Sequence, residues 1–369
     1  MTAPELLALR PLALGHDQEA SACHWAQLTR RTAEYPSRRA QLALAFMAGG
    51  APPTPDLVAL LFRCDDCGRC RRHSSLPQPP DLARALWLAR AQLVEQGAVP
   101  EVEALRARLD ADGHLLGDLS GVWQWLGPGD PDAETLFVPD GAVLAWNPPA
   151  AQAALRAARC VAGPVGLLPA VPDSGHVLRE LGLRAEAERA LAAAHAHIAE
   201  GKFRRVLAGT PKEAVALTEM LAGLPLEVAY VGTALAQAVD QGRVRLHATG
   251  GAGRRIALQP PAALLEETPV YALITAWLRG WPGDCFYDEP DALRMVWPAA
   301  VERPTIGLDP ALARRLAQYR LDQLGAWGPS LILTCDPYSW QALREVAPPG
   351  VEVMDLLVFA GLHLSEAEA

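Results

Sequence analysis

The sequence predicts an α+β multidomain protein, in which a helical N-terminal domain precedes two related α/β modules with mostly parallel sheets. Apolar residues recur at helical spacing before Gly113, short apolar runs alternate with helical segments after it, and this second part repeats itself. The expected boundaries are residues 1–113 for the helical domain, 114–249 for the first module and 250–369 for the second.

The N-terminal part of the chain carries helical patterns. Residues 21–48 favour a helix that is interrupted near Pro36, and residues 56–63 favour a short one. A longer helix is expected to begin at Asp81, which has the side chain of an N-cap, and a last one is expected over 101–110.

Strands and helices are expected to alternate after Gly113. The runs that predict strands lie at 135–138, 165–168, 206–208, 228–231, 255–258, 331–334 and 351–354. The helices expected between them cover 183–200, 211–221, 269–279, 310–324 and 339–346. This alternation is typical of βαβ units and therefore of parallel sheets.

The repeat is visible in the order of short motifs. Residues 207–211, a helix and residues 226–228 match residues 333–337, a helix and residues 351–353. The two prolines that begin these helices, Pro211 and Pro337, are 126 residues apart. Two copies of one module, joined at the glycine run 249–253, fit this pattern.

The composition excludes several classes of protein. Half of the 369 residues are apolar and 20% are charged, which excludes a disordered chain, and the net charge of −9 argues against a nucleic-acid partner. No run of 18 uninterrupted apolar residues predicts a transmembrane segment, and the N-terminus does not resemble a secretory signal. We therefore expect a cytoplasmic protein, peripheral to the inner membrane only through partners.

Seven cysteines are too few for a disulfide-stapled secreted protein of this length, but three of them form the motif Cys64-x2-Cys67-x2-Cys70. This spacing lets three thiolates of one loop converge, and it supplies three ligands to a [4Fe–4S] cluster in bacterial ferredoxins. A zinc site is the alternative, although such sites usually pair two separated C-x2-C elements and a site with His73 would be cramped. A third interpretation is a relict motif that binds nothing.

Several segments around this motif resemble a known family. They are residues 34–39, residues 42–46, residues 61–64 with the cysteine motif, and residues 80–96 with the stretch 93–97. Through them, residues 23–110 resemble the twin-cluster domain of the iron–sulfur subunits of glycolate oxidase and lactate-utilisation proteins, relatives of the heterodisulfide reductase catalytic subunit. The resemblance implies a helical ferredoxin-like domain.

The family carries two four-cysteine runs, and the resemblance implies that this chain has kept the ligands of one cluster only. Counting back from Pro36 places the last cysteine of the first run at Cys23, whereas Ala13, His16, Glu19 and Ser74 stand at lost positions. The implied ligand set of one [4Fe–4S] cluster is Cys23, Cys64, Cys67 and Cys70.

In the same family the two α/β modules carry Cys-Cys-Gly motifs. Here Asp173 and Ser174 stand where paired cysteines would be, and Asp336 stands at a ligand position of the second copy. The reduction of disulfides that this family performs is therefore not expected, because it requires the missing cysteines. Asp173, His176 and Asp336 could instead form a polar pocket. The isolated Cys160, Cys285 and Cys335 are interpreted as core residues.

The resemblance implies a single-[4Fe–4S] electron-transfer subunit of an oxidoreductase complex, without substrate chemistry of its own. The expected partner is a flavoprotein dehydrogenase acting on 2-hydroxy acids of the glycolate or lactate type, or another redox subunit. Two alternatives stay open. One is a non-redox scaffold or assembly subunit with a structural metal site or no metal, and the other is a small-molecule binder that uses the pockets of the modules.

Overall fold

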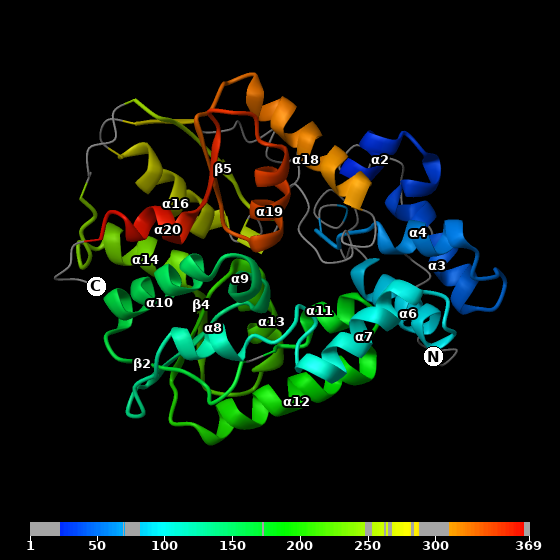
Figure 1. Ribbon diagram of the computed structural model, residues 1–369, viewed down its shortest axis with the longest axis horizontal. Helices are drawn as coiled ribbons and strands as arrows, with labels where there is room; N and C mark the ends of the chain where they lie inside the picture. The colour runs from blue at the N-terminus through cyan, green and yellow to red at the C-terminus, as the bar shows by residue number, and fades with distance from the viewer. Residues whose placement is uncertain are drawn as a thin grey trace.

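The structure is a computed structural model that describes residues 23–68, 70, 82–171, 173–247, 253–261, 263–264, 268–281, 284–287 and 310–364. In these residues a helical region lies beside two α/β modules, of which the second is stacked on the first (Figure 1). None of the described helices combines the length and the apolar character that crossing a membrane requires.

The helical region consists of α2 (His24–Thr29), the 3₁₀ turn η3 (Thr32–Glu34), α3 (Pro36–Met47), α4 (Pro55–Phe62), α6 (Leu82–Glu95), α7 (Pro100–Asp112) and α8 (Ser120–Trp125). The break expected near Pro36 is found. Arg30, the C-cap residue of α2, has a left-handed backbone conformation that ends this helix, and α3 begins at Pro36. These helices agree with the predicted pattern. A ferredoxin-like character rests on the cysteines alone and stays a prediction.

The first module contains a four-stranded parallel sheet with the order β2-β1-β3-β4. Its elements are β1 (Thr135–Val138), α9 (Gly141–Trp146), α10 (Pro148–Ala162), β2 (Val165–Gly166), α11 (His176–Glu180), α12 (Arg184–Glu200), β3 (Arg205–Ala208), α13 (Pro211–Met220), β4 (Glu227–Tyr230) and α14 (Val231–Asp240). Strand β1 is buried along its whole length, as expected of a central parallel strand.

The second module repeats this arrangement with the order β6-β5-β7-β8, again all parallel. Its described elements are β5 (Arg255–Gln259), α16 (Thr268–Arg279), β6 (Cys285–Tyr287), α18 (Pro310–Gly325), β7 (Leu331–Thr334), α19 (Pro337–Val346), β8 (Glu352–Asp355) and α20 (Leu356–Gly361). The fold class of two related α/β modules with parallel sheets is therefore confirmed. The domain boundaries stay predictions.

Polar residues end four of the strands and cap the helices that follow. The side chains of Asp140 and Thr210 accept hydrogen bonds from backbone N–H groups of α9 and α13, and those of Asp336 and Asp355 do the same for α19 and α20. Thr210 and Glu213 also have the spacing of a capping box. Because parallel strands end at one edge of a sheet, these caps gather polar groups there.

The three parts of the molecule share their cores. Helices α10 and α14 of the first module pack against α20 and α16 of the second, within one continuous apolar cluster. The core of the helical region includes Leu178, Leu181 and Leu183 around α11, so this region is joined to the first module. Trp25 of α2 packs against Leu312 and Leu316 of α18, which joins it to the second module as well.

Gly182 lies at the junction between the first module and α6. Its φ is +82°, and a Cβ there would lie 2.7 Å from the backbone of Arg90. We expect Gly182→Ala to cost about 2–4 kcal/mol, because it adds overpacking to an unfavourable backbone conformation. Urea denaturation measures this cost.

Gly113 provides the matched control for Gly182. It has a φ of +77° with open space around its Cα. Gly113→Ala should therefore cost only about 1 kcal/mol, the backbone part of the effect. Equal costs for the two substitutions would contradict the close packing of Gly182 on α6.

Candidate functional site

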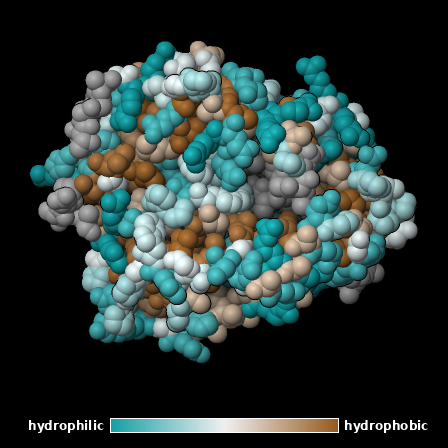
Figure 2. Space-filling view, in the orientation of Figure 1, coloured by the Kyte–Doolittle hydropathy of each residue, from teal (hydrophilic) through white to brown (hydrophobic). Residues whose placement is uncertain are grey.

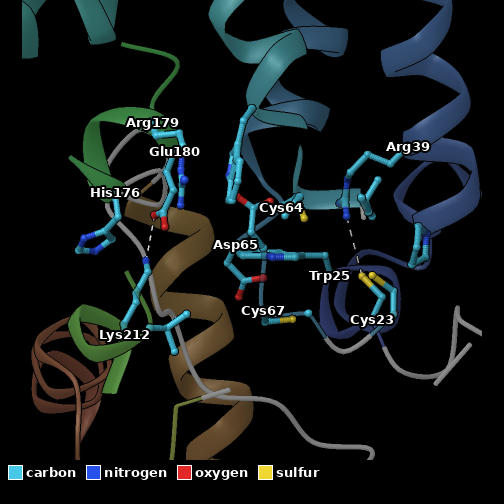
Figure 3. Close-up of a pocket in the computed structure, with 18 of the residues that line it drawn as sticks. Cys23, Trp25, Arg39, Cys64, Asp65, Cys67, His176, Arg179, Glu180 and Lys212 are labelled. Atoms are coloured by element: carbon cyan, nitrogen blue, oxygen red, sulfur yellow. Dashed lines mark hydrogen bonds and ion pairs between the residues drawn. The ribbon is translucent and has the colours of Figure 1, made fainter. Parts of the chain in front are cut away.

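Cys23, Cys64, Cys67 and Cys70 line one cavity of about 190 Å³, beside the helical region and the first module (Figure 3). Cys23 precedes α2, and the other three follow α4. The structure therefore brings together the four residues that the sequence spacing singled out. Residues of the first module, among them His176, Arg179 and Lys212, line the opposite side of the same cavity.

Arg90 of α6 holds the loop that carries Cys64 and Cys67. Its guanidinium is fully buried and donates hydrogen bonds to the carbonyl oxygens of Leu61 and Cys64 and to the carboxylate of Asp66. The same group donates to the carbonyl oxygen of Glu180, 3.0 Å away in α11. One side chain thus fixes the cysteine loop and ties it to the first module.

The backbone of the loop curls through two left-handed residues, Asp66 with φ +50° and Gly68 with φ +70°. Aspartate tolerates this conformation better than most residues. The Asp66 carboxylate also accepts a hydrogen bond of 2.9 Å from Trp87 Nε1. The loop therefore has a defined shape, which favours convergence of its thiols.

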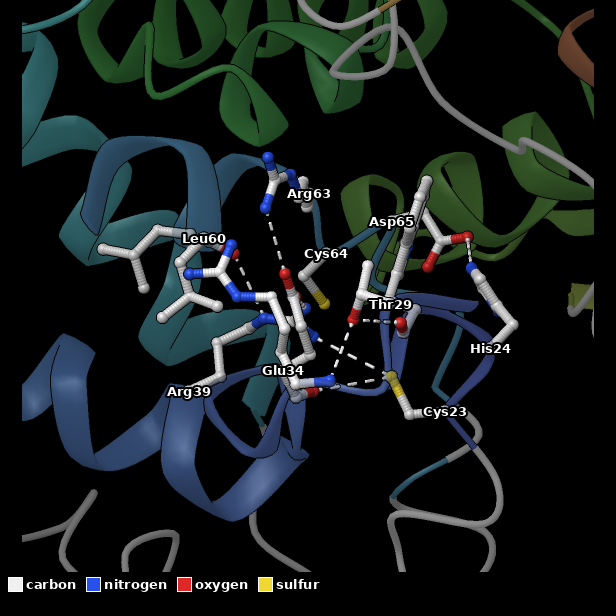
Figure 4. Close-up of polar contacts among 12 residues, drawn as sticks. Cys23, His24, Thr29, Glu34, Arg39, Leu60, Arg63, Cys64 and Asp65 are labelled. Carbon is white, nitrogen blue, oxygen red and sulfur yellow. Dashed lines mark hydrogen bonds and ion pairs between the residues drawn. The ribbon is translucent and has the colours of Figure 1, made fainter. Parts of the chain in front are cut away.

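Cys23 sits against a buried ion-pair network (Figure 4). Its thiol lies 3.7 Å from the carbonyl oxygen of Glu34, which can accept the S–H hydrogen, and 4.0 Å from Nη1 of Arg39. The buried carboxylate of Glu34 pairs with Arg39 and, at 3.2 Å, with Arg63. A positive charge thus stands beside the thiol of Cys23.

The thiol of Cys64 is buried, and burial raises its pKa above the ordinary value. Asp66 and Asp65 raise this pKa further, whereas Arg39 and Arg90 lower it. Arg39 in turn has a raised pKa, because the nearby Cys64, Cys23 and Glu34 outweigh the effect of its burial. The arginines offer counter-charge to thiolates, which a bound metal would require to be deprotonated.

Two further residues at this site were not predicted as ligands. His24 Nε2 lies 2.9 Å from Asp65 Oδ2, with both side chains buried. His24, Asp65 and Cys67 each offer a ligand atom within 4.8 Å of the others. His24 follows Cys23 and Asp65 follows Cys64 in the chain. Their position next to a cysteine could have indicated them as candidate ligands in the sequence.

A second cavity, of about 500 Å³, lies between the two modules. Figure 2 shows the molecule hollowed between its upper and lower parts, with apolar side chains in the hollow. The cavity is lined on the side of the first module by Asp140, Asp173, His176 and Glu213, and on the side of the second module by residues of α18 and α19.

His176 and Glu213 form a buried pair in this cavity. His176 Nδ1 lies 2.7 Å from Ser174 Oγ and 3.3 Å from Glu213 Oε2, and Ser174 Oγ donates to the same carboxylate at 3.1 Å. Burial raises the pKa of Glu213. The pKa of His176 is also raised, since its contacts with Glu213 outweigh its burial.

His114 lines the same cavity as His176 and Glu213. Its Nδ1 accepts a hydrogen bond of 3.1 Å from Leu116 N, which leaves the proton of the neutral ring on Nε2. A Cβ at Gly141 would lie 2.3 Å from this Nε2, so the ring needs glycine at that position. Burial lowers the pKa of His114, and nearby Asp173 and Asp140 oppose that shift.

The polar pocket expected from Asp173, His176 and Asp336 is found in part. Asp173 and His176 line the inter-module cavity, whereas Asp336 is buried at the start of α19 as its N-cap. Among the isolated cysteines, the core interpretation is right for Cys335, which is 1% exposed, and wrong for Cys285, which is exposed. Cys160 is half-buried.

No protein-family model and no curated protein matches the chain. Solved structures resemble part of it, among them two racemases. The glutamate racemase isoform RacE1 from Bacillus anthracis shows 10% identity and a TM-score of 0.31, over 63% of this chain and 80% of that one. A putative Asp/Glu racemase from Yersinia pestis shows 14% identity and a TM-score of 0.31, over 62% of this chain and 96% of that one.

These comparisons contradict the family and the main function that the sequence suggested. The two structures named above are racemases, and no family model or curated protein of the glycolate oxidase, lactate-utilisation or heterodisulfide reductase-like iron–sulfur family matches the chain. The prediction of a [4Fe–4S] electron-transfer subunit of an oxidoreductase is therefore wrong. At this identity and TM-score, the racemases in turn carry no argument for racemase activity in this chain.

The error has a physical reason. A C-x2-C-x2-C motif fixes the geometry of one short loop and leaves the fold and partners of the remaining chain undetermined. The other segments that carried the resemblance are either only four to six residues long, as 34–39, 42–46 and 61–64 are, or follow a general helical pattern, as 80–97 does.

Proposed function

We propose that the protein is a non-redox scaffold or assembly subunit in which Cys23, Cys64, Cys67 and Cys70 hold a structural metal centre. The observation that carries this proposal is that all four cysteines line one cavity between the helical region and the first module. Thiolates with arginine counter-charges are the donors that zinc and iron–sulfur centres require.

The position of the cavity supports a structural role. Segment α2, which begins after Cys23, packs on α18 of the second module through Trp25. The loop of Cys64 is tied to α11 of the first module through Arg90. A metal bound by both segments would fasten the helical region to both modules.

The stability that a metal bound by Cys23 and Cys64 would add can be compared with that of a disulfide cross-link. Cys23 and Cys64 are 41 residues apart, and a cross-link that closes a loop of that length contributes about 4 kcal/mol in the chain-entropy description of disulfides. That amount is large compared with the stability of a typical domain.

Two metals share the required donor chemistry. The [4Fe–4S] cluster predicted from the spacing is one, and a zinc ion is the other. Four sulfurs around zinc lie about 3.8 Å apart, given Zn–S bonds of about 2.3 Å and tetrahedral geometry. In the described residues no three of these thiols lie within 4.8 Å of one another, so zinc would require them to draw together.

Metal analysis after anaerobic purification tests the proposal. We expect a tightly bound centre, seen as about four iron atoms or one zinc ion per chain, that survives dithionite without reversible reduction. Cys67→Ser should lose the metal and lower the melting temperature by several degrees, whereas Cys285→Ser, at an exposed cysteine, should change neither.

Three results would overturn the proposal. They are an absence of bound metal in the unaltered protein, full metal content in Cys67→Ser, and a centre that dithionite reduces reversibly. The flavoprotein partner and the cytoplasmic location expected from the sequence stay predictions.

A further inference from the structure

The topology of the first module points to a binding site at one place. The chain passes from β1 to β2 on one side and then to β3 on the other side of β1, so the connections diverge between β1 and β3. In open parallel sheets, ligands bind in the crevice at the carboxyl ends of such strands. Asp140 follows β1 and Glu213 follows β3, at this crevice.

The two loops are fixed to each other at the crevice. Thr210 Oγ1 donates a hydrogen bond of 3.0 Å to Asp140 Oδ2. Asp140 is 3% exposed, His176 6% and Glu213 4%, and each offers a ligand atom within 4.8 Å of the other two. One imidazole and two carboxylates are ligands that suit zinc, manganese and iron.

The hydrogen-bond network assigns the proton on His176. The Glu213 carboxylate can only accept, so Ser174 donates to it and its oxygen accepts the hydrogen of His176 Nδ1. The lone pair of the neutral ring then lies on Nε2. This nitrogen is buried and has no hydrogen-bond partner in the described part of the chain.

The ring of His176 is turned away from the cysteine cavity, and its residue also lines the inter-module cavity (Figure 3). A buried nitrogen with a free lone pair is uncommon and calls for a partner that accepts it. A cation would bind Nε2 directly if the ring rotates, or would bind Nδ1 if the proton of the neutral ring moves to Nε2.

The charge of the cavity favours a cation. Its described lining includes five carboxylates and neither lysine nor arginine: Glu101, Asp140, Asp173, Glu213 and Glu345. Lys212, the lysine on α13, lies 2.9 Å from the carboxylate of Glu180 and 5.8 Å from the ring centroid of Tyr338, so it offsets part of this negative charge. Trp146 of α9 and Tyr338 of α19 also line the cavity and form an edge-to-face pair with ring centroids 5.1 Å apart.

We propose that Asp140, His176 and Glu213 bind one divalent transition-metal ion, with coordination positions open toward the inter-module cavity. The site is independent of the four cysteines. It differs from them in chemistry, because imidazole and carboxylate ligands accept Mn²⁺ whereas thiolates select softer metals. Manganese therefore probes this site separately.

Electron paramagnetic resonance of Mn²⁺ tests the proposal, because binding removes the six-line signal of the free ion. We expect one Mn²⁺ per chain, and at least tenfold weaker binding in His176→Gln and in Glu213→Gln. Asp140→Asn keeps an oxygen for the helix cap at Ala142 and should also bind more weakly. Circular dichroism confirms that each variant is folded.

Glu219→Gln is the matched control, since Glu219 lies on the same helix with an exposed side chain. It should leave Mn²⁺ binding unchanged. Zn²⁺ is added to Cys67→Ser in a second arm, followed by calorimetry. The proposal is overturned if neither ion binds, or if binding is the same in all three site variants as in the unaltered protein.

Discussion

Arg90→Met is expected to lower the free energy of unfolding by about 3–5 kcal/mol, the cost of breaking a buried charged network. The substitution leaves the Asp66 carboxylate without its buried cation, and it leaves the carbonyl oxygens of Leu61, Cys64 and Glu180 without this donor. Since these groups belong to the cysteine loop and to α11, the junction between the helical region and the first module should loosen. Urea denaturation followed by tryptophan fluorescence measures the loss.

Arg84 provides the matched control, because it lies on the same helix α6 and is exposed. Arg84→Met should change the stability by no more than about 0.5 kcal/mol. Arg90→Lys should recover little of the loss, since a single ammonium group cannot reproduce a planar set of donors to four partners. A loss below 1 kcal/mol in Arg90→Met would contradict the role assigned to this side chain.

The sequence predicted the sheets best where strands are buried on both faces. The expected ranges 135–138 and 331–334 coincide with β1 and β7, because a continuous apolar run between turn residues leaves little choice of boundaries. Strand β6 was missed. It is three residues long, lies at the edge of its sheet and is partly exposed, so it carries no comparable run.

Some helices were missed for a related reason. Helix α10 buries mainly alanines, and a face of small residues gives a weak apolar pattern even though alanine favours helix strongly. Helices α9, α14 and α20 each begin within three residues after a strand, where the apolar pattern changes from the strand period of two to the helical period of 3.6.

The two candidate sites differ in how far the sequence could reveal them. The resemblance implied Cys23 as a partner of Cys64 by counting positions from Pro36, and both residues line one cavity. Asp140 and Glu213 have no such mark, since capping of a helix already accounts for each of them. They meet only because β1 and β3 are neighbours in the sheet, and the pairing of strands cannot be read from either segment alone.

Asp355→Asn is expected to make the protein more stable above pH 7, to stabilise it less at pH 5, and to leave it nearly unchanged below about pH 3.5. Burial raises the pKa of Asp355 from 3.8 to about 7, with a further contribution from Asp336. Between these values the folded protein binds more protons than the unfolded chain, so stability falls as the pH rises from about 4 to about 7. Three pKa units correspond to about 4 kcal/mol, an upper bound for the gain in the variant.

Asparagine removes the charge and keeps an oxygen that can accept from Leu357 N and Val358 N, so the cap of α20 is preserved. Melting temperatures of the variant should therefore vary less between pH 5 and pH 8.5 than those of the unaltered protein. The remaining slope is assigned to Asp336, whose pKa burial raises to about 6, and to Glu213 and His176, whose pKa values are also raised. Asp118→Asn, at an exposed aspartate that accepts from Ser120 N, should keep the original slope. If Asp355→Asn keeps that slope as well, the buried carboxyl group is not what makes stability fall with rising pH.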